Sequence, residues 1–258
     1  MTFRPESYAM RGIAGEVTQA LEAGRIVLAF QPVVDARATD RVAFHEALLR
    51  LVRRDGSVAM AGGFLPLVEA TALGRALDRH ALDLALEALA ATPDLRLSVN
   101  ISPLTVGDAL WDWTLEAAFD RDPTVTDRLI VEITESAVAP DPGAVATFVR
   151  QVQATGASVA LDDFGAGAPS LRNLRDLRFD VLKIDRAFSQ GIDRDPDNRA
   201  CVQAIAGLGR HFEALVVAEG VETTAAAETL IGLGVDALQG HHFGQPRLAT
   251  DPVARLRA

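Results

Sequence analysis

The sequence predicts an α/β fold, a (β/α)8 barrel whose first strand is antiparallel to its neighbour. Short apolar runs that read as strands alternate with helix-like segments along most of the chain, as in parallel α/β folds. The chain has 258 residues, which is close to the length of one such barrel. A short turn near Thr39 joins the first two strand-like runs, so these form a hairpin and pair in antiparallel fashion.

The N-terminal part reads as a helix, a hairpin and two more helices. Residues 11–23 have apolar side chains at helical spacing, and Gly24 follows as a stop. Pro32 marks a bend or an edge after the first strand, because proline cannot donate to a strand ladder. The expected elements are a helix at 11–23, strands at 26–30 and 42–49, a polar glycine-rich loop at 53–63, and helices at 64–72 and 75–91.

The remainder repeats one pattern, in which an apolar strand stops at a polar or charged residue and a helix follows. The expected elements are strands at 95–99, 129–131, 158–161, 181–182, 215–218 and 235–238, and helices at 108–119, 142–155, 197–212 and 223–232. Parallel strands of a barrel share one direction, so their C-terminal ends meet at one mouth. The side chains expected there are Glu46, Asn100, Glu132, Asp162, Asp163, Lys183, Glu219 and Gln239.

The pair Asp162-Asp163 indicates a metal site. Two adjacent carboxylates at a strand end repel each other unless a cation, a proton or solvent screens them, and a solvated Asp-Asp turn is the alternative. The carboxylate oxygens and the amide oxygen expected at the strand ends are hard ligands, which suit Mg²⁺ or Mn²⁺. The chain has no cysteine cluster and no paired-histidine motif, which argues against structural zinc, and His241 and His242 are expected to be packing or rim residues.

Composition limits the classes of partner. The formal net charge of −10 argues against electrostatic binding to a nucleic acid polymer or an anionic membrane. No segment has the apolar length of a membrane span, and we expect one domain over residues 1–258. The single cysteine, Cys201, excludes a disulfide within the chain and suggests a reducing cytoplasm; we expect it to be a small buried hydrophobe.

Seven ordered motifs between residues 26 and 247 resemble those of EAL-domain cyclic-di-GMP phosphodiesterases. They are Glu46-Ala47-Leu48-Leu49-Arg50, Val99-Asn100-Ile101-Ser102, Glu132-Ile133-Thr134-Glu135-Ser136, Leu161-Asp162-Asp163-Phe164-Gly165, Leu182-Lys183-Ile184-Asp185-Arg186, Val217-Ala218-Glu219-Gly220-Val221-Glu222-Thr223 and Gln239-Gly240. The resemblance implies a modified TIM barrel that hydrolyses cyclic-di-GMP to linear pGpG with two Mg²⁺ or Mn²⁺ ions.

The resemblance also implies a role for each matching residue. The metal ligands would be Glu46, Asn100, Glu132, Asp162, Asp163, Glu219 and Gln239. The catalytic residues would be Lys183 at the attacking water, Glu219 as general base or partner of a metal-bound water, and Asp185 in support. Arg50, Gln31 and Glu222 would contact substrate, and Glu135 would hold the loop that follows Asp163.

The sequence departs from the family in loops and leaves the ligand positions intact. The segment Gly165–Ser170 lacks the usual threonine and tyrosine, Leu51–Gly56 lacks the usual tryptophan and His-Pro pair, and His241-His242-Phe243 replaces Tyr-Leu-Phe. The implied partners are cyclic-di-GMP, a second copy in a homodimer, and a GGDEF or sensory domain in a longer parent chain. The alternative function is a cyclic-di-GMP receptor without turnover, and Ca²⁺ is expected to inhibit because it takes more ligands at longer distances.

Overall fold

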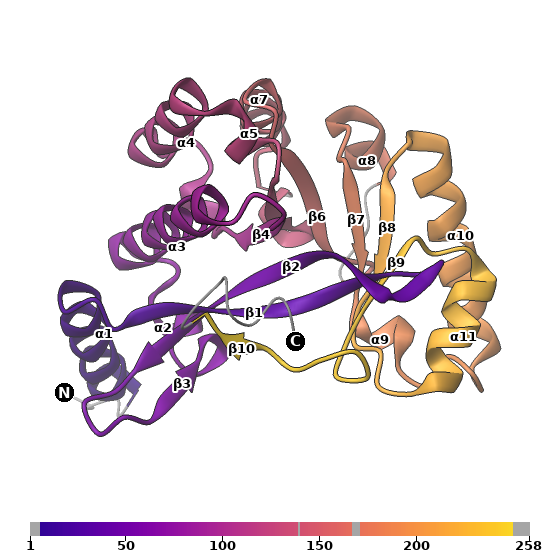
Figure 1. The fold of residues 1–258 in the computed structure, drawn as a ribbon, viewed down its shortest axis with the longest axis horizontal. Helices are drawn as coiled ribbons and strands as arrows, with labels where there is room; N and C mark the ends of the chain where they lie inside the picture. Colours follow the sequence, from indigo (N-terminus) through magenta and orange to yellow (C-terminus); the bar gives the residue numbers. More distant parts are fainter. Residues whose placement is uncertain (1–5, 139, 167–170, 250–258) are drawn as a thin grey trace.

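The computed structural model describes residues 6–138, 140–166 and 171–249, which build a closed barrel of eight strands surrounded by helices (Figure 1). The barrel order is β1-β9-β8-β7-β6-β5-β4-β2, and β2 pairs back onto β1 to close it. The barrel strands are β1 (Ile26–Asp35), β2 (Ala38–Val52), β4 (Leu97–Asn100), β5 (Leu129–Thr134), β6 (Ser158–Phe164), β7 (Val181–Ile184), β8 (Leu215–Ala218) and β9 (Ala237–Gln239).

Strand direction confirms the predicted fold class. From β2 through β4 to β9, every neighbouring pair along the barrel is parallel. By contrast, β1 is antiparallel to both of its barrel neighbours, β2 and β9. Two short strands extend the sheet outside the barrel: β3 (Val58–Met60) pairs with β2, and β10 (Arg247–Leu248) pairs with β1. The fold is therefore a modified TIM barrel with an antiparallel first strand.

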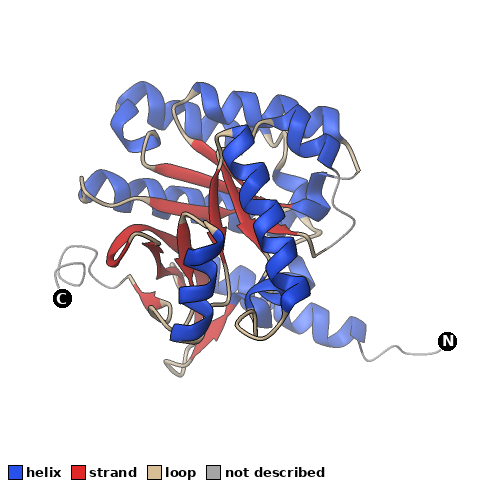
Figure 2. Cartoon of the chain, turned by 90° about the vertical axis from the view of Figure 1, so that its right-hand side faces the viewer, coloured by secondary structure: helices blue, strands red, loops and turns tan. Residues whose placement is uncertain are grey.

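The helices lie outside the strands, as the view from the side shows (Figure 2). The longer ones are α1 (Glu6–Glu22), α3 (Ala72–Ala91), α4 (Ala109–Arg121), α7 (Pro142–Ala154), α8 (Leu171–Leu177), α10 (Pro196–Phe212) and α11 (Thr224–Leu233). The short ones are α2 (Leu65–Val68), α5 (Pro123–Thr126), α6 (Glu135–Val138), α9 (Arg186–Ser189) and the 3₁₀ turns η1 (Ala61–Gly63) and η2 (Pro103–Thr105).

Capping residues fix where several helices begin. Asp141 and Asp195 each accept from a backbone N–H of the first turn, and each is followed by a proline, whose missing N–H costs nothing at that position. Asp108 caps α4 in the same way without a proline. These starts are within a residue or two of the positions predicted from the sequence.

Several element bounds predicted for the N-terminal part were wrong. The first strand continues through Pro32 to Asp35, because β10 pairs with β1 only at Ala29 and Phe30, and β9 only from Val33 onwards. Pro32 therefore lies where β1 has a partner on one side alone, and its missing N–H leaves no ladder bond unmade. The expected loop at 53–63 contains β3, which the Asp55-Gly56 turn returns onto β2, and η1.

The expected helix at 64–72 is shorter, and the next one starts earlier. Only Leu65–Val68 is helical there, since Thr71 is extended and caps α3 through Leu73 N–H, so α3 begins at residue 72 rather than 75. Gly74 in its first turn passes so close to Glu69 that a Cβ would stand 2.3 Å from the Glu69 carbonyl oxygen. Cys201 corrects another expectation, because it is exposed on α10 and not buried.

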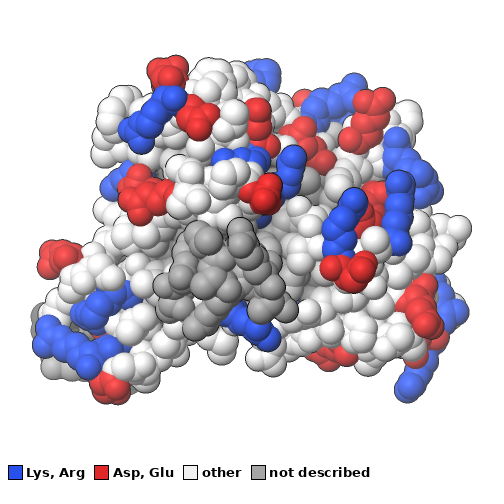
Figure 3. Space-filling view, in the orientation of Figure 1, with Lys and Arg blue, Asp and Glu red and all other residues white. Residues whose placement is uncertain are grey.

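Charges are spread over the surface in small groups. Figure 3 shows acidic and basic side chains next to one another over the described part of one face. Several form ion pairs, such as the half-buried pair of Arg53 with Glu16 at 2.8 Å and the exposed pair of Arg175 with Asp176 at 2.6 Å. No helix among the described residues has both the length and the apolar character needed to cross a membrane. The dense cluster of carboxylates lies at the barrel mouth.

Candidate active site

Two successive layers of inward-facing side chains fill the barrel near its mouth, the end at which the parallel strands terminate. The lower layer is apolar and contains Val33, Phe44, Ala160, Val181, Val217 and Ala237, all buried. Side chains on one face of a strand recur every second residue, so the next inward position on each strand lies one layer higher. Those positions are Gln31, Glu46, Asp162, Lys183, Glu219 and Gln239. Gln31 comes before Val33 in the sequence because β1 runs in the opposite direction.

Lys183 lies at the centre of the polar layer. Its side chain is fully buried, and Nζ lies 2.6 Å from Glu132 Oε2 and 2.6 Å from Glu219 Oε1. Asp162 Oδ1 is 3.2 Å away and Glu46 Oε2 is 3.8 Å away. One ammonium group therefore holds carboxylates from β2, β5, β6 and the residue after β8 in a single cluster.

A second set of contacts orients Glu46. Asn100 Nδ2 donates to Glu46 Oε1 at 2.7 Å, and Gln239 Nε2 donates to Glu46 Oε2. Gln239 Nε2 also lies 3.3 Å from Gln31 Oε1. Because both amide groups donate through nitrogen, their oxygens are left to face other partners, and Gln239 Oε1 is buried without a hydrogen-bond partner among the residues that the structure describes.

The two adjacent aspartates lie on a distortion of β6. Pairing of β6 with β7 shifts register between Leu161 and Phe164, and Asp163 has a left-handed φ of 54°. Such a conformation costs energy for a residue other than glycine and is found at functional sites. The bulge turns both carboxylates toward the mouth, where regular alternation would send them to opposite faces.

Burial and like charges shift the pKa values of this cluster. Burial, opposed in part by Lys183, raises the pKa of Glu132 to about 8, and it raises the pKa of Glu219 well above its usual value. Burial, then the charges of Asp162 and Asp185, raises the pKa of Asp163 to about 6. Burial lowers the pKa of Lys183, but the surrounding carboxylates outweigh it and keep the ammonium charged.

The residues present fit divalent cations. Oxygens of Asp162, Asp163 and Glu219 all lie within 4.8 Å of one another. Among the described residues, Glu132 Oε1 and Gln239 Oε1 are buried oxygens without a hydrogen-bond donor, and Asp162 Oδ1, also buried, has only the ion-pair contact with Lys183 Nζ at 3.2 Å. Buried acceptors of this kind are costly unless a cation, a donor or water meets them. The cluster has one ammonium, that of Lys183, and a larger number of carboxylates, which leaves a surplus of negative charge for cations to neutralise. These carboxylates belong to Glu46, Glu132, Asp162, Asp163 and Glu219.

A pocket of about 250 Å³ opens from this cluster to the surface. Its inner wall includes Glu46, Asp162, Glu219 and Gln239. Its outer wall comes from the short helix α9 and the loops after β8 and β9, with Arg186, Gln190, Gly220, Glu222, Gly240 and His241. Gly240 is required there, because a Cβ would stand 2.0 Å from the Val221 carbonyl oxygen.

Comparison with known proteins identifies the family. Residues 14–246 match the family model of the EAL domain. The chain belongs to the EAL-domain cyclic-di-GMP phosphodiesterase family. It is 36% identical over 246 residues to the bifunctional diguanylate cyclase/cyclic di-GMP phosphodiesterase MucR of Pseudomonas aeruginosa, covering 93% of this chain and 36% of MucR. It is 30% identical over 242 residues to the cyclic di-GMP phosphodiesterase PdeF of Escherichia coli, covering 92% of this chain and 32% of PdeF.

A solved structure agrees with the sequence matches. The PaMucR phosphodiesterase in complex with c-di-GMP has a TM-score of 0.84 to this chain at 36% identity, covering 92% of this chain and 98% of that one. The chain thus spans about a third of the length of the curated relatives it matches and nearly all of the solved domain.

Some residues predicted for the EAL site lie away from its centre. Arg50 is buried, and its guanidinium donates to the Leu49 carbonyl at 2.9 Å rather than to a carboxylate. Glu222 is exposed at the pocket rim. Asp185 lies at the start of α9, where it accepts from Ala187 N–H at 2.8 Å, with Asp163 close enough to feel its charge.

The loop after Asp163 is tied to Glu135. Glu135 Oε2 accepts from the Gly165 backbone N–H at 3.2 Å. Gly165 has a left-handed φ of 98°, and a Cβ there would stand 2.6 Å from the Phe188 ring. The rest of the segment that departs from the family, residues 167–170 including Pro169, lies outside the described residues.

Sequence reasoning missed two features of this EAL domain. Arg186 and Gln190 were given no role, although both line the pocket, Arg186 at the start of α9 and Gln190 directly after its end. Lys183 is moreover the only lysine of the chain, whose other 24 basic residues are all arginine. A compact ammonium with three donors fits the enclosed cluster of carboxylates, whereas a planar guanidinium is larger and more rigid.

Proposed function

We propose that this chain hydrolyses one phosphodiester of cyclic-di-GMP to linear pGpG with two Mg²⁺ or Mn²⁺ ions. The main support is one observation: four carboxylates, those of Glu46, Glu132, Asp162 and Glu219, lie within 3.8 Å of a single buried ammonium, and two buried oxygens beside them, Glu132 Oε1 and Gln239 Oε1, have no hydrogen-bond donor among the described residues. The proposed cation ligands are Glu46, Asn100, Glu132, Asp162, Asp163, Glu219 and Gln239. When bound, the cations would neutralise the phosphate and lower the pKa of an attacking water.

The protein's own residues have separate roles in this proposal. Lys183 is charged and fixed by carboxylate contacts at 2.6 Å, so it can hold an attacking oxygen by charge and hydrogen bonding. Glu219 is the proton acceptor, since it lies at the pocket wall and burial raises its pKa toward the range of a general base. Asp185 supports the site by holding the start of α9 beside Asp163.

Substrate would enter through the pocket above the cluster. A volume of about 250 Å³ is small for a cyclic dinucleotide, so one phosphodiester enters while the guanine bases extend over the rim. Gln31 and Glu222 line that path and are proposed substrate contacts, with Arg50 as a phosphate contact reached by rearrangement of its side chain. Arg186 adds a positive charge at the rim, opposite the acidic inner wall.

The wider assignments are also proposals. We propose that residues 1–258 form one EAL-type domain, which works as a homodimer in the cytoplasm and lies beside a GGDEF or sensory domain in a longer parent chain; the two curated relatives named above are about three times as long as this chain. The bond from Gly165 N–H to Glu135 supports a loop-holding role for this glutamate.

The decisive test is turnover. Purified protein is incubated with cyclic-di-GMP and Mg²⁺, and the products are separated by chromatography, with Asp162→Ala as the inactive control. Appearance of pGpG only with the parent protein supports the proposal. If calorimetry shows that the parent binds cyclic-di-GMP while no product forms with either Mg²⁺ or Mn²⁺, the chain is a receptor instead.

A further inference from the structure

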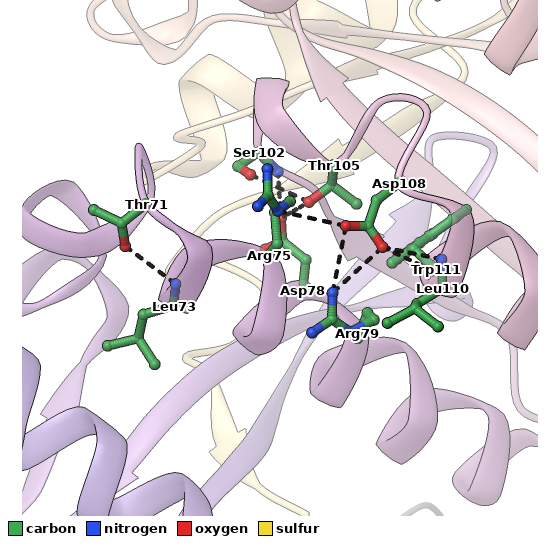
Figure 4. A network of polar contacts seen from close by, with 10 residues as sticks. All are labelled: Thr71, Leu73, Arg75, Asp78, Arg79, Ser102, Thr105, Asp108, Leu110 and Trp111. Carbon is green, nitrogen blue, oxygen red and sulfur yellow. Dashed lines mark hydrogen bonds and ion pairs between the residues drawn. The ribbon is translucent and has the colours of Figure 1, made fainter.

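The chain that follows Asn100 is held by two different elements in succession. The N–H of Ile101 donates to the Glu132 carbonyl at 3.0 Å, which is the last link of β4 to its neighbour strand. The next N–H, that of Ser102, leaves the sheet and donates to Asp78 Oδ2 on α3 at 2.8 Å (Figure 4). Asp78 thus binds the first backbone N–H beyond the sheet, that of Ser102, two residues after Asn100.

Asp78 closes a small buried network. Its Oδ2 also accepts from Thr105 Oγ1 at 2.6 Å, and the Thr105 N–H donates to the Ser102 carbonyl at 3.0 Å. The three residues are all buried: Asp78 is 6% exposed, Ser102 9% and Thr105 0%. Such a network holds one arrangement of the turn, because any other would leave buried donors unpaired.

The same face of α3 holds the far end of this loop separately. Arg75 and Arg79, three residues before and one after Asp78, lie 3.4 Å and 3.3 Å from the carboxylate of Asp108, which caps α4 (Figure 4). Asp108 is eight residues beyond Asn100, whereas Ser102 is two. The loop therefore has a near anchor and a far anchor that can be removed independently.

Asn100 depends on accurate placement of its backbone. Its Nδ2 donates to Glu46 Oε1 at 2.7 Å, which turns the amide oxygen away from Glu46 and leaves it available as a ligand. Peptide groups on both sides of Ile101 must be fixed to keep that orientation. One of them is fixed by the sheet, through the Ile101 N–H, and the other by Asp78, which accepts from the Ser102 N–H.

We propose that Asp78 is a positioning residue for the metal site, which sets the orientation of Asn100 through the Ser102 N–H. This inference rests on the proposed role of Asn100 as a cation ligand. Residues that orient metal ligands from outside the coordination sphere commonly change metal affinity by 10- to 100-fold when lost. Asp78 acts through backbone rather than side chain, so its removal should fall near the lower end of that range.

The test measures Mn²⁺ binding by calorimetry in the absence of substrate. Asp78→Ala should weaken Mn²⁺ binding about 10-fold. Asp78→Asn keeps an acceptor oxygen in the place of Oδ2 and should bind close to the parent. Asp108→Ala, the matched control, loses the far anchor and the α4 cap, so it should lower the melting temperature without changing Mn²⁺ affinity.

The outcomes separate this inference from the proposed function. A folded Asp78→Ala protein with parental Mn²⁺ affinity overturns the positioning role. So does an Asp108→Ala protein that loses affinity as strongly as Asp78→Ala, since loop stability alone would then explain both. If Asp78→Ala does not fold, Asp78→Glu replaces it, because the added methylene displaces Ser102. A folded Asp78→Glu protein with parental Mn²⁺ affinity would likewise overturn the positioning role. Failure of the parent itself to bind Mn²⁺ refutes the metal-dependent function instead.

Discussion

Replacing Lys183 with methionine removes the one positive charge that forms ion pairs with the carboxylate cluster in the described part of the chain. The ammonium lies 2.6 Å from Glu132, 2.6 Å from Glu219 and 3.2 Å from Asp162, and it has no exposed surface. Breaking a buried ion pair from one side costs about 3–5 kcal/mol. At roughly 2–4 °C per kcal/mol for a chain of this size, Lys183→Met should melt about 6–20 °C below the parent without metal.

The assay is thermal unfolding followed by circular dichroism in EDTA and in excess Mn²⁺. The deficit should shrink in Mn²⁺, because cations can replace the lost ammonium, while hydrolysis stays absent. Combining Lys183→Met with Glu132→Gln should restore part of the stability, since one surplus carboxylate is then gone. Arg194→Met is the control, because its side chain is 89% exposed and its ion pair with Asp193 contributes little.

A parental melting temperature for Lys183→Met in EDTA would refute the reasoning, because the carboxylates would then not depend on the ammonium for their stability. A further check uses the unusual composition of the chain. Since Lys183 is the only lysine, protein labelled with ¹⁵N-lysine has one side-chain ammonium signal, which should shift on addition of Mn²⁺ and be missing from the variant.

Four further predictions use the same protein. Asp162→Ala should abolish hydrolysis without lowering metal-free stability, because it removes a ligand and relieves repulsion; turnover comparable to the parent at saturating Mg²⁺ would contradict this. Ca²⁺ should bind yet inhibit, since its longer bonds and extra ligands misplace the reacting oxygens, and equal rates in Ca²⁺ and Mg²⁺ would refute the argument. Glu135→Ala should weaken Mg²⁺ affinity and lower activity, because the bond from the Gly165 N–H is lost, whereas Ala166→Thr should leave activity unchanged or raise it modestly; a Mg²⁺ titration of Glu135→Ala identical to that of the parent would show that Glu135 does not hold the loop. Metal-free stability should fall as pH rises from about 4.5 to 8. Burial raises the pKa of Glu132 from its usual 4.5 to about 8, so the folded state binds more protons than the unfolded state in that window. A melting temperature in EDTA that increases across this pH range would exclude the shift.

The sequence alone determined the fold class and the composition of the barrel mouth. Apolar strand runs that stop at a polar residue force the C-terminal strand ends together once the sheet closes, so Glu46, Asn100, Glu132, Asp162 and Lys183 could be grouped without coordinates. The short turn predicted near Thr39 was enough to predict the antiparallel first strand, although the turn itself lies at residues 36–37 and Thr39 already belongs to β2. These predictions depend on periodicity and order along the chain, which are local properties.

The tertiary structure decided everything that depends on distance between elements. Pro32 continues a strand only because β10 and β9 leave it unpaired on one side, and no local pattern contains that information. The bulge that turns Asp162 and Asp163 to the same side requires the register of β7 against β6. Asp78 shows the limit most clearly: in the sequence it is one acidic residue on an amphipathic helix, and only packing of α3 against the end of β4 places its carboxylate on the Ser102 N–H.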